Sequence, residues 1–230
     1  MRAKLLVLAL LLTGIDMFSQ QDSQFTQYMY NTINVNPAYA GSRGVMSIFG
    51  LYRTQWVGLD GAPTTATASL NTPISNSNIG LGLSAIKDQI GPSDETSISA
   101  DVSYSIPTSE SWKLSFGLKA TANLLNIDFT KLNIYNPADP RFQNNVDNKF
   151  SPNVGAGIYF HSNKTYLGLS VPNFFFFLHF DESAATNSAS FVAKERMHYY
   201  AIAGHVFDLS PSIQFKPAAM AKIVQGAPLQ

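Results

Sequence analysis

The 230-residue sequence contains no cysteine. This absence excludes a disulfide framework, a thiolate metal site and a lipid anchor on cysteine. Charge is also scarce, because 13% of residues are charged whereas an ordinary soluble domain has roughly 25%. The apolar fraction is an ordinary 45%, so Ser, Thr, Asn, Gln and Gly take the place of the missing charge. This composition suits a chain with one apolar face and one wet, weakly charged face.

The charges that are present cancel, and long apolar runs are missing after the first residues. Fifteen Lys and Arg residues balance fifteen Asp and Glu residues, so no net field attracts nucleic acid. Residues 1–19 have the pattern of a secretory signal, because Arg2 and Lys4 precede the apolar run Leu5–Leu12. That run is shorter than the ~20 residues that span a bilayer. We therefore expect a cleaved signal peptide and no transmembrane helix.

After this leader, apolar residues alternate with small or polar residues at a period of two. Within 97–106, for example, the apolar residues oppose four serines and one aspartate. No stretch carries a helical apolar stripe with caps, so helix is expected only as a minor part of the loops. About nine runs are predicted to be strands: 44–55, 64–73, 79–88, 96–106, 112–124, 152–161, 165–171, 198–208 and 212–224.

Such alternation fits a soluble sandwich with its apolar face inward, or a membrane barrel with its apolar face outward. Most of the runs have about 9–13 residues, near the roughly 9–11 of a tilted membrane strand and above the usual 5–6. Tyr and Trp recur at the ends of the runs, as in the aromatic girdles of barrels. Length is the stronger argument for the barrel, since aromatic residues also fill soluble β cores.

The lengths of the connections favour the barrel too. The predicted tight turns are 74–78, 107–111, 161–164 and 208–211. The predicted longer links are 56–63, 88–95, 125–151 and 172–197. Outer-membrane barrels alternate in this way between short periplasmic turns and long external loops. We therefore predict an all-β fold, with an antiparallel outer-membrane β-barrel over 44–230.

The predicted barrel has a defect at its end. Nine strands is an odd number, whereas bacterial single-chain barrels use even numbers. The chain stops at KIVQGAPLQ, just after a strand. An open edge facing lipid would leave backbone groups unpaired. Three explanations are open: the strand count is wrong, the chain is truncated, or a partner closes the sheet. We favour truncation, so we expect 44–230 to form an incomplete barrel.

No pattern typical of an enzyme is present. The four histidines lie far apart, without the spacing of metal ligands. The Gly-x-Gly stretches at 80–82 and 155–157 do not open a helix after a strand, so they do not predict phosphate loops. On the inner face of a barrel, such glycines simply make room. No G-x-S-x-G motif occurs. We predict no catalytic, cofactor-binding or metal-binding residue, and no enzyme.

Three stretches are candidates for contact with a partner protein. NTINVNPAYAGSRG (31–44) lies mostly within a segment, 20–43, that we expect to be periplasmic or to plug the lumen. YRTQWVGLDGAPTT (52–65) follows the first strand, and FFFFLHF (174–180) is an apolar run in an external loop. Bracing of the barrel is the alternative for the first stretch. Lumen bracing or a well-packed hairpin loop is the alternative for the second, and a loop folded into the lumen or a strand extension into lipid is the alternative for the third. The candidate residues are Asn36, Pro37, Tyr39, Arg53, Trp56, Asp60, Phe175 and Phe176.

At these stretches the chain resembles the PorP/SprF family of outer-membrane proteins of the type IX secretion system and gliding machinery. The motif N-P-A-Y-A-G, followed by R-x-Q-W-V-G and G-A-P, carries the resemblance. It continues in SPNVGAGIYFHSNKTYLGLSVPN (151–173) and HYYAIAGHVFDLSPSIQFKPAAMAKIVQGAP (198–228), and so covers nearly the whole mature chain.

The resemblance implies a non-enzymatic β-barrel in the outer membrane of a Gram-negative bacterium. It implies contact with outer-membrane lipid, with periplasmic ring components and with a secreted surface adhesin or other client. Family members are usually longer, with further strands after the G-A-P segment, which agrees with the odd strand count. A passive porin or small-solute transporter is the alternative on the same scaffold. A soluble β-sandwich binding module is the third hypothesis.

Overall fold

The computed structural model describes residues 28–132, 145–175 and 197–224. The predicted signal peptide and Phe176 lie outside these residues. Within them, no helix has the length and apolar character needed to cross a membrane. The strands are β1 (Ser47–Thr54), β2 (Thr64–Pro73), β3 (Ile79–Ile90), β4 (Ser93–Pro107), β5 (Lys113–Ile127), β6 (Val146–His161), β7 (Thr165–Val171), β8 (His198–His205), β9 (Phe207–Ser210), β10 (Ile213–Phe215) and β11 (Ala218–Val224).

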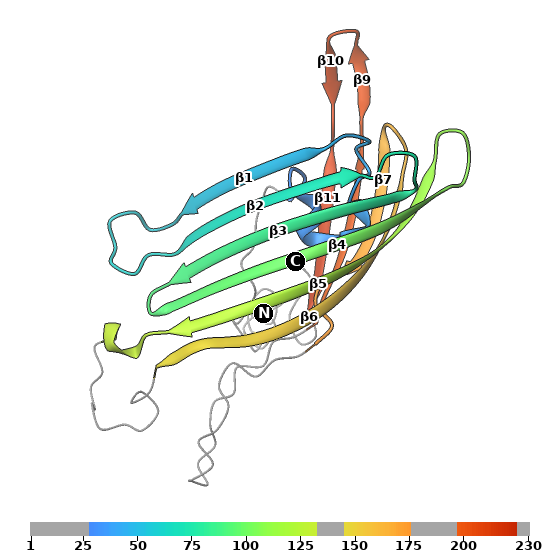
Figure 1. The fold of residues 1–230 in the computed structure, drawn as a ribbon. Helices are drawn as coiled ribbons and strands as arrows, with labels where there is room; N and C mark the ends of the chain where they lie inside the picture. The colour runs from blue at the N-terminus through green and yellow to red at the C-terminus, as the bar shows by residue number, and fades with distance from the viewer. Residues whose placement is uncertain (1–27, 133–144, 176–196, 225–230) are drawn as a thin grey trace, which may run out of the picture.

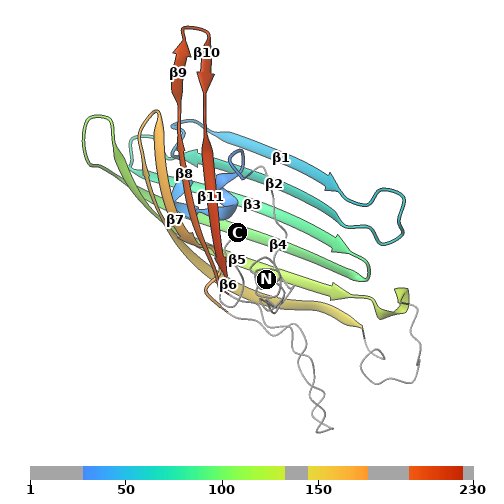
Figure 2. The same ribbon diagram turned by 180° about the vertical axis from the view of Figure 1, so that it is seen from behind.

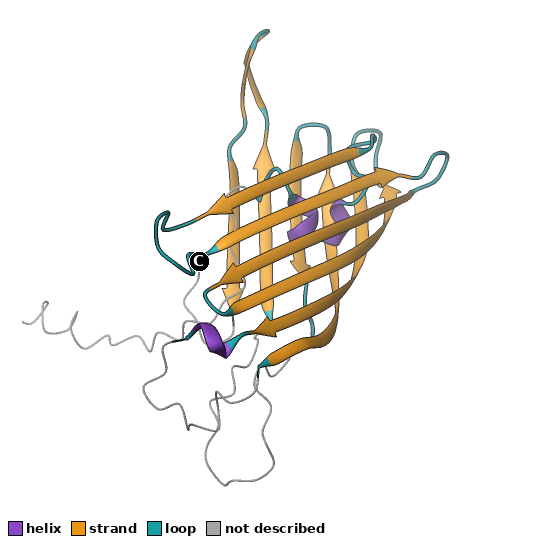
Figure 3. Cartoon of the chain, turned by 60° about the vertical axis from the view of Figure 1, so that its left-hand side comes forward, coloured by secondary structure: helices purple, strands orange, loops and turns teal. Residues whose placement is uncertain are grey.

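Nine of these strands form one antiparallel sheet in the order β1-β2-β3-β4-β5-β6-β7-β8-β11. The sheet curls into a half-barrel with a concave and a convex face (Figure 1 and Figure 3). β1 and β11 are its two edges, and in the described part of the chain neither pairs with a further strand. The predicted all-β, antiparallel fold with nine strands in the sheet is confirmed.

The last two predicted strands are interrupted in the structure. The predicted run 198–208 is divided at Val206 into β8 and β9, and the run 212–224 is divided at 216–217 into β10 and β11. β9 and β10 pair only with each other. They form a hairpin that extends past the rim of the sheet (Figure 2).

One predicted loop is wrong. The stretch 88–95 is a tight turn rather than a long link, because β3 continues to Ile90 and β4 begins at Ser93. Gly91 has a φ of 56°, a left-handed conformation that glycine adopts without steric penalty. Pro92 cannot donate to the ladder and ends the pairing. The chain therefore reverses in two residues, and both strands are longer than the alternation indicated.

The two faces of the sheet divide by polarity in the direction opposite to a soluble β-protein. On β4, Ser99, Asp101 and Ser103 are buried on the concave face, whereas Ile98 and Val102 on the convex face are exposed. The same division holds on β5 and β6. A soluble sandwich buries its apolar face, so the exposure of the two faces is the reverse of that arrangement.

Residues 28–44 lie within the concave face (Figure 1). They include the short helix α2 (Thr32–Val35) and the 3-10 turn η1 (Pro37–Tyr39). Asn36 caps η1, since its Oδ1 accepts a hydrogen bond from the Ala38 N–H at 3.0 Å. Pro37 occupies the first position of the turn, where its missing N–H leaves no bond unmade. A third short element, η2 (Phe129–Lys131), follows β5.

Candidate functional site

A row of small residues crosses the concave face of the sheet. Each member is paired in register with the next, from β3 to β7. Because neighbouring strands lie roughly 4.8 Å apart, residues in register form a continuous line across the sheet. The absence of large side chains along this line, called the channel below, lets another stretch of main chain lie close to the sheet. The small-residue row consists of Gly80, Ser103, Gly117, Gly157 and Ser170.

The segment 35–40 follows the small-residue row. At one end, the Ser103 hydroxyl donates to the Ala40 carbonyl at 2.6 Å. At the other end, the Ser170 hydroxyl donates to the Val35 carbonyl at 2.8 Å. The segment therefore spans the strands from β4 to β7 and is bonded to the sheet at both ends.

Glycine is required where the segment approaches the strands most closely. A Cβ on Gly117 would lie 2.1 Å from the Ala38 nitrogen, and a Cβ on Gly157 would lie 2.1 Å from the Asn36 Oδ1. Both separations are far below van der Waals contact. The two glycines form part of a channel that fits this backbone and no larger neighbour.

Asn36 is the most extensively bonded side chain of the segment. It is 0% exposed. Its Nδ2 donates to the Ile158 carbonyl on β6 at 3.0 Å and lies 3.5 Å from the Leu169 carbonyl on β7. The side chain therefore contacts two adjacent strands while its Oδ1 caps the turn that follows. A buried amide with these bonds fixes the register of the segment on the sheet.

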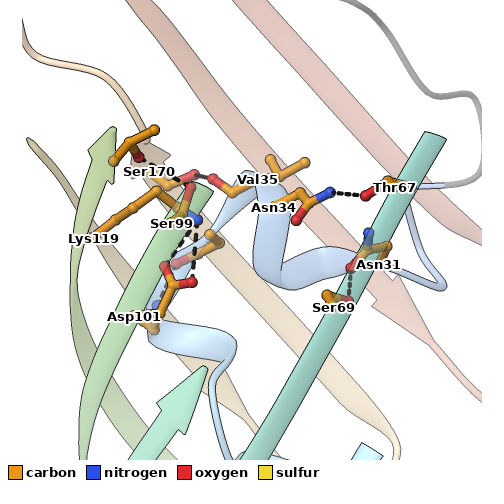
Figure 4. Close-up of polar contacts among 12 residues, drawn as sticks. Asn31, Asn34, Val35, Thr67, Ser69, Ser99, Asp101, Lys119 and Ser170 are labelled. Carbon is orange, nitrogen blue, oxygen red and sulfur yellow. Dashed lines mark hydrogen bonds and ion pairs between the residues drawn. The ribbon is translucent and has the colours of Figure 1, made fainter. Parts of the chain in front are cut away.

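The residues just before this segment bond to β2 (Figure 4). The Ser69 hydroxyl donates to the Asn31 Oδ1 at 2.7 Å, and the Asn34 Nδ2 donates to the Thr67 hydroxyl at 3.2 Å. These bonds are made by short side chains on both partners. These polar bonds accompany an apolar cluster, in which Tyr28 and Ala38 pack with Tyr159 and Ile202 of the sheet.

An ion pair is buried in the same face, on β4 and β5 (Figure 4). The Lys119 Nζ lies 2.9 Å from the Asp101 Oδ1, and the side chains are 4% and 0% exposed, respectively. The two residues are directly opposite in the ladder. A buried pair of this kind contributes little net stability but strongly disfavours the loss of one partner.

Aromatic side chains pack against the segment on the β6–β7 side. The rings of Tyr39 and Tyr159 meet edge to face with centroids 5.6 Å apart, and Tyr166 lies 5.8 Å from Tyr159. Burial raises the pKa of the Tyr39 phenol, and Arg43 partly offsets that rise. Tyr39 is therefore neutral at physiological pH and acts here as a packed, uncharged side chain.

The sequence-predicted candidate residues fall into two groups. Asn36, Pro37 and Tyr39 lie in the concave face and contact the sheet. The others described lie at the rim where the longer loops emerge: Arg53 at the end of β1, Trp56 and Asp60 in the loop 55–63, and Phe175 after β7.

The rim residues have distinct settings. Trp56 is 68% exposed and has a φ of 51°, a conformation that a bulky residue rarely adopts. Asp60 is exposed. The Phe175 backbone bonds to the Asn153 side chain, which accepts from its N–H at 3.0 Å and donates to its carbonyl at 3.2 Å. The loop after β7 is thereby tied to β6, and a role of these residues in partner binding stays a prediction.

The residues that form the channel were not among the candidates. Gly80 and Gly157 belong to the Gly-x-Gly stretches that were interpreted as making room on the inner face of a barrel, whereas Gly117 is recognisable only as a small member of an alternating pattern. Their alignment depends on the register of four hairpins, which the alternation does not specify. Within the described ranges, no group of three or more His, Asp or Glu residues could hold a metal ion.

A family model described as "Type IX secretion system membrane protein PorP/SprF" matches residues 17–230. No curated protein and no solved structure matches the chain. The match covers every residue of the channel and of the segment that fills it.

Proposed function

The chain belongs to the PorP/SprF family of type IX secretion system membrane proteins, and on that premise we propose that it is a non-enzymatic outer-membrane component that helps to export or hold a surface protein. Its partners in this proposal are outer-membrane lipid, the periplasmic ring of the secretion complex and the secreted client. The observation that carries the proposal is the pairing of an exposed apolar face with a concave face occupied by the chain itself.

The convex face supports insertion in a membrane. Leu83, Leu118 and Leu169 are 58%, 63% and 63% exposed there, and the polar side chains are turned inward. In water, such a surface would drive association. In a bilayer, it is the surface that a barrel presents to acyl chains.

The occupied concave face argues against a passive porin. An open pore needs a wet lumen, whereas residues 28–44 lie against the inner wall and are bonded to β2, β4, β6 and β7. We propose that this part of the chain plugs the lumen, as the alternative to a free periplasmic segment. A small-solute transporter is the second candidate, because a displaced plug would expose a polar wall.

Deletion in the native host tests the proposal. Cells lacking the chain should keep their outer-membrane barrels but lose specific proteins from the cell surface, and re-expression should restore them. The tagged protein should fractionate with the outer membrane and show a heat-modifiable band. An unchanged surface proteome, or recovery of the mature chain as a soluble periplasmic protein, would refute the proposal.

Planar bilayers distinguish the two candidates. A secretion component with a seated plug should show no steady channels, whereas a porin conducts with a defined step. A variant that lacks residues 28–44 is the matched control, because it tests whether these residues are what blocks conductance. Steady conductance by the intact chain would favour the transporter.

Photo-crosslinkers in cells test the partner residues. A crosslinker at Trp56 or Asp60 should capture a partner from the rim, whereas one at Pro37 should react within the chain. Partner capture from Pro37 alone would place the contact in the concave face, contrary to this proposal.

A further inference from the structure

The β9–β10 hairpin has two chemically different faces. One face is apolar and exposed. Its residues are Phe207 (48% exposed), Leu209 (67%), Ile213 (58%) and Phe215 (55%). Phe207 is directly opposite Phe215 in the ladder, and their rings lie 6.4 Å apart. Residues two apart in a strand share a face, so Leu209 lies on the side of Phe207 and Ile213 on the side of Phe215, although the register shifts between Ile213 and Gln214.

The other face is polar and is tied to the sheet. The Asp208 carboxylate forms an ion pair with Lys164 of the β6–β7 turn, and the Gln214 Nε2 donates to it at 2.9 Å. Nearby, the Lys216 ammonium lies 5.6 Å from the centre of the Tyr166 ring. These contacts hold the hairpin in one orientation and leave the apolar face uncovered.

The apolar face of the hairpin continues the convex face of the sheet. His205 is the last residue of β8, and its ring lies 4.4 Å from the ring of Phe207. This ring contact places the His205 and Phe207 side chains on the same side, across the break in the strand at Val206. The convex face lower on the same strands carries Tyr199 and Ile223, which are 47% and 51% exposed and directly opposite each other. The convex face of β8 and β11 therefore continues onto the apolar face of the hairpin through His205, whose Nδ1 is hydrogen-bonded to the Thr165 hydroxyl at 2.7 Å.

The hairpin lengthens the two strands from which it extends, because β9 follows β8 and β10 precedes β11 along the chain. The four residues of β9 add about 13 Å at ~3.3 Å per residue.

We propose that the β9–β10 hairpin is part of the membrane-crossing wall, with lipid acyl chains covering Phe207, Leu209, Ile213 and Phe215. The wall is then taller at β8 and β11 than at the neighbouring β6–β7 turn. The polar face of the hairpin lies above that turn and lines the inner side of the wall. This inference uses membership of a membrane-protein family but not the role in export, so either can fail alone.

Site-directed spin labelling tests this inference, because the chain has no cysteine to remove. Two variants of the full mature chain, Leu209→Cys and Phe215→Cys, each carry one spin label and are studied in phosphatidylcholine vesicles. Leu169→Cys on the convex face of β7 is the lipid-facing control, and Glu110→Cys in the β4–β5 turn is the water-facing control. Collisions with oxygen report lipid, and collisions with a water-soluble nickel chelate report solvent. Heat-modifiable mobility shows that each variant is folded.

Labels at 209 and 215 should match the Leu169 control, with high oxygen access and loss of the nickel broadening seen at Glu110. Nickel access equal to that at Glu110 would overturn the inference, because the hairpin would then stand in water. Low access to both reagents, with the Leu169 control normal, would also overturn it, because the apolar face would then be covered by protein.

Discussion

Replacing Gly117 by alanine should displace the N-terminal segment from the concave face. The added Cβ would lie 2.1 Å from the Ala38 nitrogen and 2.4 Å from the Pro37 carbonyl carbon. These are backbone atoms of a 3-10 turn, so no side-chain rotation relieves the overlap. Overpacking of this kind costs about 1–3 kcal/mol, which is a factor of about 5–150 in the ratio of seated to displaced segment.

Hydrogen exchange measures that ratio directly. The amides of Asn36, Ala38 and Ala40 are bonded within the seated segment at 2.8, 3.0 and 3.1 Å. Their exchange in Gly117→Ala should be faster by about the same 5- to 150-fold factor, since they exchange through the displaced state. The amides of β5 should change little, because the ladder itself is intact.

Gly50→Ala is the matched control. Gly50 lies on β1, and a Cβ added there would have no atom within 4 Å. That variant should change only the free energy of unfolding, by the roughly 0.5–1 kcal/mol of stabilisation expected when alanine replaces glycine in a strand. Wild-type exchange at Ala38 in a folded Gly117→Ala protein would refute the reasoning, because the segment would then not depend on the channel.

The ion pair, the cap of η2 and the convex face each carry a further prediction. Lys119→Met leaves Asp101 buried and unpaired, so the stability measured by urea titration of the heat-modifiable band should fall by about 3–5 kcal/mol; an unchanged midpoint contradicts this. Hydrogen bonds from Thr130 lower the pKa of Asp128, so the capped turn is stable above the ordinary aspartate pKa of about 4 and loosens as the pH falls through the lowered value. Exchange of the Thr130 amide should show that loss of protection, and Asp128→Asn should abolish its pH dependence. Leu118→Arg should destabilise the protein in vesicles by about 2–4 kcal/mol if it lies near the bilayer midplane, and equal stability to wild type would place this face outside the lipid.

The alternation of residues was enough to predict most of the fold. Side chains of a strand alternate between faces as a local consequence of the pleat, so the runs 64–73 and 165–171 agree with β2 and β7 at both ends. The errors arose where local pattern and pairing differ. Gly91 made a two-residue turn where a long link was predicted, and Val206 interrupted a run that the pattern showed as continuous.

The candidate site was only partly predictable. The stretch 31–44 was predicted to contact a partner or brace the barrel, and Pro37 within it has no N–H to donate to a strand ladder. Its contacts with the sheet could not be predicted from the sequence, because the Val35 carbonyl bonds to Ser170 at a separation of 135 residues. Contacts over such separations depend on the register and curvature of every strand between them.

The sequence by itself determined that the chain has one apolar and one polar strand face, since that division requires only a period of two. It also determined the family, since the N-P-A-Y-A-G and R-x-Q-W-V-G motifs are read without a structure. Only the tertiary structure decided that residues 28–44 lie against the concave face, and which residues of that face they contact. The reason is that Gly117 and Gly157 become one channel only after β5 and β6 pair in register.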